Sequence, residues 1–190
     1  MIDKEHLSSR ELGLLLAQQL LDVVDLHYGL WDADLEVSPG NLALAQQRYT
    51  EMLLGLLGRL LADSKQPRLL DVGCGTGHML QQLLQQGYQV DAVNPSAHLN
   101  RLVRERLAKI PQLDTRLFEC GFEALPFQQL QQHYDVLLFC ECFQYIPLPD
   151  IFPQPPACYA REDGWLFVIF SRRRRIVMEN TEIAVSVAVM

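Results

Sequence analysis

The chain has 190 residues, of which 49% are hydrophobic and 21% are charged, and its formal net charge is −7. This length and composition suit one globular domain with a sizeable hydrophobic core. The acidic balance argues against a broad nucleic-acid-binding surface, which needs a basic face. The five cysteines lack paired CxxC spacing, so we expect no metal site and a reducing, cytoplasmic compartment.

Two helices are predicted before the first strand. One extends from Ser9 to about Leu26 and the other from about Asn41 to Leu61, because apolar residues recur in both at helical spacing. An aromatic segment with a central glycine, residues 27–32, is predicted to form a loop between them. We expect neither a secretory signal peptide nor a membrane span, since charged residues open the chain and polar residues interrupt its longest apolar stretch.

A glycine-rich turn organises the rest of the chain. Residues 68–72 are predicted to form a buried strand, and a helix is predicted to begin at His78. Between them, glycine alternates with other residues at Gly73, Gly75 and Gly77. Glycine allows backbone angles that other residues avoid and lets a ligand approach the main chain. Asp71 lies at the end of the strand, where open α/β sheets bind their ligands, and the helix start offers free N–H groups there.

Short apolar runs alternate with helical segments after this turn. Strands are predicted over 89–93, 116–119, 134–139 and 165–170, and a helix is predicted over 97–108. Strands that alternate with helices indicate a parallel sheet with helices on both faces. We therefore predict one α/β domain over residues 1–190, with a helical amino-terminal part over 1–62 and the strands within a core over 68–171.

The glycine turn also carries a recognisable motif. The segment DVGCGTG, residues 71–77, resembles the first motif of class I S-adenosylmethionine-dependent methyltransferases, in particular those that act on small molecules. Its GxGxG spacing differs from the GxGxxG of dinucleotide sites, which disfavours a dinucleotide oxidoreductase. Segments at 90–96, 122–127, 134–139 and 164–169 resemble later motifs of the family in order and spacing. The resemblance implies a Rossmann-like, mostly parallel sheet that binds S-adenosyl-L-methionine and transfers its methyl group to a small-molecule acceptor.

The resemblance further implies a cofactor site at the carboxyl edge of the sheet. Its expected residues come from the glycine turn, the end of the second strand, the segment after the third strand and two outlying positions. They are Asp71, Gly73, Cys74, Gly75, Gly77, Asn94, Pro95, Gly121, Phe122, Glu123, Glu141 and Tyr28.

Two of these positions depart from the family's pattern. Asn94 stands where the family has an acid that accepts both ribose hydroxyls, and we expect its carboxamide oxygen to accept there instead. The alternative is that Asn94 serves the turn before Pro95. Gly121 stands where many relatives have Asp, so that backbone groups or the nearest carboxylate, Glu123, would contact the adenine amino group. Phe122 either covers the adenine ring or belongs to the hydrophobic core.

Three residues are candidates for catalysis. Glu141 and Gln144 follow the fourth strand, where cofactor and acceptor meet in this family; the alternative for Glu141 is an acid that stabilises a helix start. His27 lies in the aromatic segment, which resembles the lid over the cofactor in related enzymes, and could act as a base near neutral pH. Tyr28, in the same segment, could reach the methionine part of the cofactor.

The carboxyl-terminal part departs most from the family. Five prolines lie within residues 147–156, where relatives have a helix, and only residues 172–190 remain after the fifth strand. We therefore expect a shortened carboxyl end, which together with Asn94 leaves open a cofactor-binding regulatory module without catalysis. The arginine run 172–175 leaves open a nucleic-acid methyltransferase. We expect a small-molecule substrate, no nucleic acid and no membrane partner, and the sequence does not set the oligomeric state.

Overall fold

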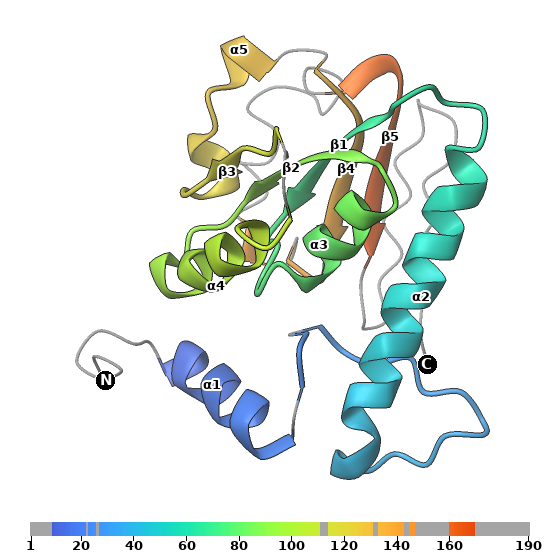
Figure 1. Cartoon of the computed structure of the whole chain (residues 1–190), viewed down its shortest axis with the longest axis vertical. Helices are drawn as coiled ribbons and strands as arrows, with labels where there is room; N and C mark the ends of the chain where they lie inside the picture. The colour runs from blue at the N-terminus through green and yellow to red at the C-terminus, as the bar shows by residue number, and fades with distance from the viewer. Residues whose placement is uncertain are drawn as a thin grey trace.

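A five-stranded parallel sheet forms the centre of the molecule (Figure 1). The computed structural model describes residues 9–21, 23–25, 27–110, 114–130, 133–142, 145–146 and 160–169. The strands are β1 (Arg68–Val72), β2 (Gln89–Val93), β3 (Leu117–Phe118), β4 (Tyr134–Cys140) and β5 (Ala160–Ile169). Their order is β3-β2-β1-β4-β5, and each neighbouring pair is parallel, which confirms the predicted α/β sheet.

The direction in which strands are added reverses between β1 and β4. From β1 the chain moves outward through β2 and β3, and it then returns to the other side of β1 to form β4 and β5. In sheets of this kind, the loops that follow the two central strands diverge at the carboxyl edge, and ligands bind between them. The fold therefore puts the glycine turn after β1 and the segment after β4 on either side of one expected binding region.

Helices connect the strands and cover them. They are α1 (Ser9–Leu21), η2 (Pro39–Asn41), α2 (Leu42–Leu60), α3 (His78–Gln85), α4 (Ala97–Leu107), η3 (Phe122–Ala124) and α5 (Phe127–Leu130). Figure 1 shows α2 beside the sheet, α3 and α4 in front of it, and α1 apart from it. None of the helices in the described part of the chain combines the length and the hydrophobicity that crossing a bilayer requires.

One face of the sheet packs against α2 and α3. Tyr49, Leu53 and Leu57 recur every four residues along α2 and are at most 1% exposed. They share one hydrophobic cluster with Leu80 of α3 and Leu69 of β1. Because burying a large apolar side chain contributes about 1.5–3 kcal/mol, this cluster fixes both helices on the sheet.

The other face packs against the segment that follows β3. Phe122 of η3, Leu125 and Leu130 share a second cluster with Leu70 of β1 and Phe139 of β4. The rings of Phe122 and Phe139 meet edge to face, with their centroids 5.3 Å apart. Helical segments therefore lie on both faces as predicted, although those on this face are short.

The first helix is shorter than predicted. It ends at Leu21 and not near Leu26, because residues that follow it bond to other parts of the chain. The carbonyl oxygen of Val24 accepts a hydrogen bond from Thr76, and that of Asp25 accepts one from Gln46. Residues 24 and 25 are thus docked on other parts of the chain, and their main chain is not helical.

Two of the five predicted strands have the predicted bounds, and the other three differ from them. β1 and β2 have the predicted bounds, and β4 extends one residue further, to Cys140. β3 keeps only the two residues Leu117–Phe118 of the predicted run. β5 begins at Ala160 rather than near Trp165, because Ala160 pairs with Tyr134 across an irregular register. The polar residues 161–163 conceal this pairing in the sequence.

Candidate functional site

Left-handed glycines shape the turn between β1 and α3. Gly73, Gly75 and Gly77 have φ angles of 70°, 57° and 78°, which glycine adopts without the steric cost that other residues meet. A Cβ atom at Gly73 would also lie 2.5 Å from the Cβ atom of Cys142. The absence of a side chain thus lets the turn approach the segment after β4.

Strand β2 holds this turn in place. The carbonyl oxygen of Val93 accepts a hydrogen bond from Gly73 N at 2.8 Å. One residue later, Nδ2 of Asn94 donates to the carbonyl oxygen of Gly75 at 3.2 Å. The end of β2 therefore fixes the turn through its main chain and through the Asn94 side chain.

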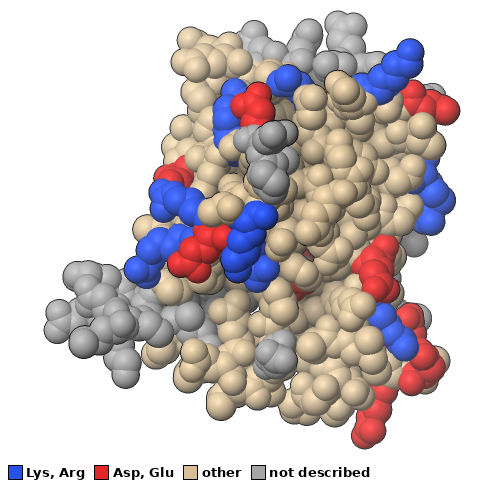
Figure 2. Space-filling view, in the orientation of Figure 1, with Lys and Arg blue, Asp and Glu red and all other residues tan. Residues whose placement is uncertain are grey.

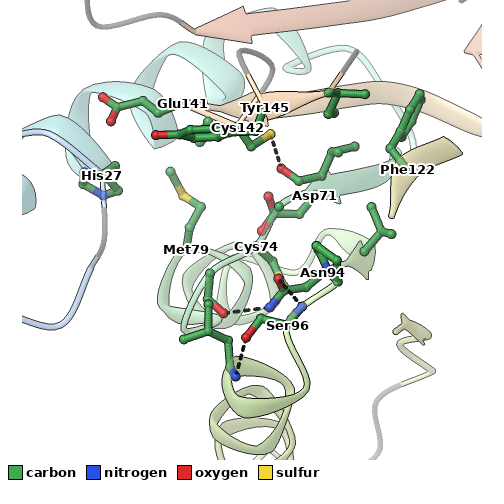
Figure 3. A pocket seen from close by; sticks show the side chains of 18 of the residues that line it. His27, Asp71, Cys74, Met79, Asn94, Ser96, Phe122, Glu141, Cys142 and Tyr145 are labelled. Atoms are coloured by element: carbon green, nitrogen blue, oxygen red, sulfur yellow. Dashed lines mark hydrogen bonds between the residues drawn. The ribbon is translucent and has the colours of Figure 1, made fainter. Parts of the chain in front are cut away.

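A cavity of about 610 Å³ lies against the turn at the carboxyl edge of the sheet (Figure 3). Segments far apart in the sequence supply its lining. The predicted residues that line it are His27, Tyr28, Asp71, Gly73, Cys74, Gly75, Asn94, Pro95, Gly121, Phe122, Glu123 and Glu141. Gly77 does not line it and instead packs against Val103 of α4, where a Cβ atom would lie 3.1 Å from Cγ2. Gln144 lies outside the described residues, so its catalytic role stays a prediction.

Asp71 is the most deeply buried carboxylate of the cavity wall. It is 2% exposed, and its Oδ2 atom has no hydrogen-bond partner among the described residues. Burial and the negative charge of Asp25 raise the pKa of Asp71 to about 7. A buried carboxylate without a partner is unfavourable, and a cation beside it would stabilise it. The site therefore suits a ligand that carries a positively charged group.

An extended segment, which we call the strap, passes along the cavity; it consists of residues 23–25 and 27–30. It docks on the glycine turn, where Thr76 Oγ1 donates to Val24 O at 2.8 Å. It also docks on α2, where Gln46 Nε2 donates to the carbonyl oxygens of Asp25 at 3.2 Å and His27 at 2.7 Å. These bonds use main-chain oxygens of the strap, so they hold it independently of most of its side chains.

Glu141 ties the strap to the end of β4. Its Oε2 atom accepts a hydrogen bond from Tyr28 N at 2.7 Å, and the residue is buried. Glu141 has a φ angle of 57°, so its main chain lies in a left-handed bend, and its side chain contacts the strap. The structure thus brings two residues of the predicted site into direct contact.

A buried carboxylate of the strap, that of Asp25, lies close to two histidines. Asp25 Oδ2 accepts hydrogen bonds from His78 Nδ1 at 2.7 Å and from Thr50 Oγ1 at 3.3 Å. His27 Nε2 contacts Thr50 Oγ1 at 3.0 Å, and His27 Nδ1 donates to Tyr28 O at 2.7 Å. Both ring nitrogens of His27 are therefore engaged in hydrogen bonds in this arrangement. A role for His27 as a general base would require these contacts to open.

These contacts shift the pKa of both charged partners. Burial would raise the pKa of Asp25, but the hydrogen bonds from His27 and His78 hold it well below its usual range. Burial would lower the pKa of His27, but the hydrogen bond and charge of Asp25 outweigh this effect and raise it. Sequence reasoning missed Asp25, because a single acid after a helix has no distinctive spacing. Its closeness to the aromatic segment is the one signal that could have pointed to it.

The segment after β3 brings the expected carboxylate, that of Glu123, to the cavity. A side chain at Gly121 would overlap the Glu123 carboxylate, which therefore occupies the space that residue 121 leaves empty. Phe122 is 4% exposed and belongs to the core cluster with Phe139, yet it also lines the cavity. Both interpretations of Phe122 are thus compatible with its position. Figure 3 shows it on the opposite side of the cavity from His27.

Four cysteine side chains are among the residues that line the cavity. They are Cys74, Cys120, Cys140 and Cys142. Burial raises the pKa of Cys74 and Cys140 well above its ordinary value, so these thiols stay protonated at neutral pH and are poor nucleophiles. Within the part of the chain that the structure describes, no group of three or more His, Cys, Asp or Glu side chains is arranged to hold a metal ion.

Known proteins resemble this chain in sequence. Residues 69–154 match the sequence model of the methyltransferase domain family. A ubiquinone biosynthesis O-methyltransferase of Leptothrix cholodnii is 24% identical over 152 residues, which cover 80% of this chain and 61% of that protein. An uncharacterized methyltransferase of Alkaliphilus oremlandii is 35% identical over 68 residues, which cover 36% of this chain and 31% of that protein. The chain thus spans less than two thirds of the length of these relatives.

Solved structures share the fold. Geranyl diphosphate C-methyltransferase from Streptomyces coelicolor A3(2), in complex with Mg²⁺, geranyl-S-thiolodiphosphate and S-adenosyl-L-homocysteine, matches with a TM-score of 0.60 and 21% identity. The match covers 80% of this chain and 58% of that chain. A geranyl diphosphate methyltransferase in complex with GPP and sinefungin matches with a TM-score of 0.59 and 22% identity, again over 80% of this chain and 58% of the other. At these identities the likeness concerns the Rossmann-like fold.

Proposed function

The chain belongs to the class I S-adenosylmethionine-dependent methyltransferase family, and from this premise we propose that it binds S-adenosylmethionine and transfers the methyl group to a small-molecule acceptor. The observation that carries the proposal is the cavity in which a left-handed glycine turn meets the buried carboxylate of Asp71. When bound, S-adenosylmethionine supplies a methyl group that its sulfonium activates for transfer.

The cavity suits such a ligand in size and in charge. Its volume of about 610 Å³ lies in the range of about 300–1,000 Å³ that is typical of small-molecule sites. The unpartnered Oδ2 atom of Asp71 would pair with the ammonium group at the amino-acid end of the ligand, because a cation there stabilises the buried carboxylate. This pairing supports the proposed orientation, with the amino-acid end at the glycine turn.

The remaining lining residues are assigned by their place along the cavity. We assign Gly73, Cys74 and Gly75 to the amino-acid end, beside Asp71. Asn94 and Pro95, at the end of β2, are assigned to the ribose end. The segment 121–123, which lies across the cavity from His27, is assigned to the adenine ring, with Glu123 as the carboxylate nearest to it.

The acceptor is proposed to bind beside the strap, near the end of β4. Tyr28, His27 and Glu141 lie there, and Gln144 is proposed to contribute from the segment that follows. His27 and Glu141 are engaged in hydrogen bonds that hold the strap, so we propose that they act mainly by positioning it. Methyl transfer needs alignment of the acceptor and a site with little water, and a docked strap provides both.

The class of acceptor is proposed from the relatives. Relatives from Leptothrix cholodnii and Bordetella bronchiseptica are named as ubiquinone biosynthesis O-methyltransferases, and a structural neighbour is named as a geranyl diphosphate C-methyltransferase. These names support a small organic acceptor that is methylated on oxygen or carbon. We also propose a cytoplasmic location, because the number and spacing of the cysteines suit a reducing compartment.

Thermal unfolding with S-adenosylhomocysteine, the demethylated product, tests the binding step. At a ligand concentration of about 100 times the Kd, binding should stabilise the folded chain by about 2.7 kcal/mol and raise its Tm. Gly75→Leu should abolish this rise, because residue 75 has a φ angle of 57° and lines the cavity. Gly40→Leu is the matched control, since Gly40 has open space around it. An unchanged Tm in folded wild-type protein would contradict the proposal.

A cofactor-binding module without catalysis is the second candidate, because Asn94 replaces the acid of the family pattern. Transfer of a labelled methyl group from S-adenosylmethionine to quinol and prenyl acceptors separates the two functions. Binding without transfer to any acceptor, together with a stable protein partner, would favour the module.

A further inference from the structure

Asn94 makes contacts that differ from those expected of a ribose ligand. Its Nδ2 atom donates to Gly75 O at 3.2 Å, and its Oδ1 atom accepts from Ser96 N at 3.4 Å (Figure 3). Its own carbonyl oxygen accepts from Asn100 Nδ2 at 3.2 Å, and the residue is only 4% exposed. Both ends of the carboxamide are therefore engaged within the chain.

The glycine turn depends on donors from outside itself. Gly75 has left-handed backbone angles, and its carbonyl oxygen accepts from the Asn94 side chain. The next carbonyl oxygen, that of Thr76, accepts from Arg106 Nε of α4 at 3.0 Å. Buried main-chain oxygens need partners, so these two side chains set the orientation of consecutive peptide groups in the turn. The bond from Asn94 fixes the peptide group that contains the carbonyl oxygen of Gly75.

We propose that Asn94 is a positioning residue, which holds the Gly75 peptide group in the orientation that binds the cofactor, and that this position requires an amide because it must donate. The inference rests on the proposed cofactor site. A carboxylate accepts from ribose hydroxyls but has no proton to donate to Gly75 O. It would also add negative charge to a wall that already contains Asp71 and Asp25. Asn94 is thus selected by the turn and is not a weakened form of the family's acid.

The substitution Asn94→Asp should change the Kd of S-adenosylhomocysteine in opposite directions, depending on whether Asn94 contacts the ribose or positions the glycine turn. Restoring the acid would tighten the binding of S-adenosylhomocysteine if Asn94 were a weakened ribose ligand. We expect instead that the Kd rises about tenfold or more, because the Gly75 carbonyl loses its donor. Asn41→Asp is the matched control, since Asn41 Nδ2 donates to Glu36 O at 2.9 Å on the surface. The Kd of this control should equal that of the wild type.

A second ligand separates positioning of the turn from contact with the ribose. The Kd values of S-adenosylhomocysteine and of its 2′,3′-dideoxy analogue are measured for wild type, Asn94→Asp and Asn94→Ala, well below the Tm of each. If Asn94 positions the turn, the substitutions should raise the Kd values of both ligands by similar factors. If Asn94 contacts the ribose, they should raise only the Kd of the ligand that has the hydroxyls. Asn94→Ala removes the donor without adding charge, so it decides the question if Asn94→Asp does not fold.

Three results would overturn this inference while the proposed function stands. They are equal or tighter binding by Asn94→Asp, a loss confined to the ligand with ribose hydroxyls, and a lower Tm with both Kd values unchanged. The last would mean that the Asn94 bond serves stability alone. A folded wild type that binds neither ligand would overturn the proposed function, and this inference with it.

Discussion

The Asp71 carboxylate links the stability of the folded chain to pH. Its pKa is raised to about 7 by burial and by Asp25, from an ordinary value of 3.8. Between these values, the folded chain holds a proton on Asp71 that the unfolded chain has released. The stability that this group contributes is therefore full below about pH 4 and is lost as the pH rises through 7.

We expect Asp71→Asn to stabilise the ligand-free chain at pH 8 and to abolish binding of S-adenosylhomocysteine. Moving the pKa from 3.8 to about 7 corresponds to at most about 4 kcal/mol, and the gain should shrink towards zero at pH 4. Urea unfolding at pH 4, 6 and 8 measures it, with the exposed Asp63→Asn as a control. If Asp71→Asn were less stable than the wild type at pH 8, the Asp71 carboxylate could not be an uncompensated charge in the folded chain.

The stability that Asp25 contributes depends on pH in the opposite direction from that of Asp71, and His27, its partner, adds a second limit at higher pH. The lowered pKa of Asp25 gives stability that is present above about pH 4 and lost as the pH falls. The raised pKa of His27 gives stability that is present below about pH 6.5 and lost as the pH rises through its folded value. The pair therefore stabilises the chain most between about pH 4 and 6.5.

Asp25→Asn should accordingly destabilise the chain most between about pH 4 and 6.5. Removing one partner of a buried ion pair costs about 3–5 kcal/mol, and the two side chains are each 8% exposed. The pH dependence of urea unfolding tests this prediction. Asp34→Asn is the control, because Asp34 pairs with Arg48 at the surface and its loss should have little effect. A loss of stability that is the same at pH 5 and pH 9 would refute the pairing.

Single residues were predicted from the sequence with unequal success. Asp71 and Gly75 belong to a local motif, and both line the cavity as expected. Gly77 belongs to the same motif but packs α3 against α4, which its spacing does not reveal. Asp25 was missed, because its partners His27 and His78 meet only in the folded chain. Local patterns identify residues whose backbone conformation matters, but not those that act through distant contacts.

At the scale of elements, the strap depends on a close approach to α2. A side chain at Gly29 would overlap Ala45, and Leu30 N donates to Ala45 O at 2.8 Å. Gly29→Ala should therefore displace the strap, at a cost of about 1–3 kcal/mol in stability, and should weaken binding of S-adenosylhomocysteine. Gly40→Ala, which meets no atom within 4 Å, should change neither property. Equal Kd values for Gly29→Ala and wild type would exclude the strap from ligand binding.

Elements defined by their own sequence were predicted well, and those defined by distant partners were not. β1 and β2 are short apolar runs bounded by turn residues, and their bounds agree with the structure. The end of α1 is set by bonds from the strap to residues more than fifty positions away. The start of β5 is set by its pairing with β4. Neither partner is apparent in the local sequence.

At the scale of the whole molecule, the charges on one face are mixed. Figure 2 shows Lys and Arg side chains over the region of α4, with acidic side chains among them. Arg104 of α4 pairs with Glu119, and Arg116 beside β3 pairs with Asp91. The cations of these pairs are neutralised by neighbours, whereas a nucleic-acid-binding face needs unopposed positive charge. This face therefore offers no excess of positive charge for a nucleic acid, and the arginine run 172–175 lies outside the described residues.

The strap also joins the first part of the chain to much later parts. Val24 bonds to a residue 52 positions away, Asp25 to one 53 positions away, and Tyr28 to one 113 positions away. Closing such long loops loses chain entropy, which must be offset by contacts already formed in a core. During synthesis the strap emerges before the sheet, yet it can dock fully only after β4 has been made and paired. A chain arrested before Glu141 would have the glycine turn but not its closed cavity, so the site is completed late in folding.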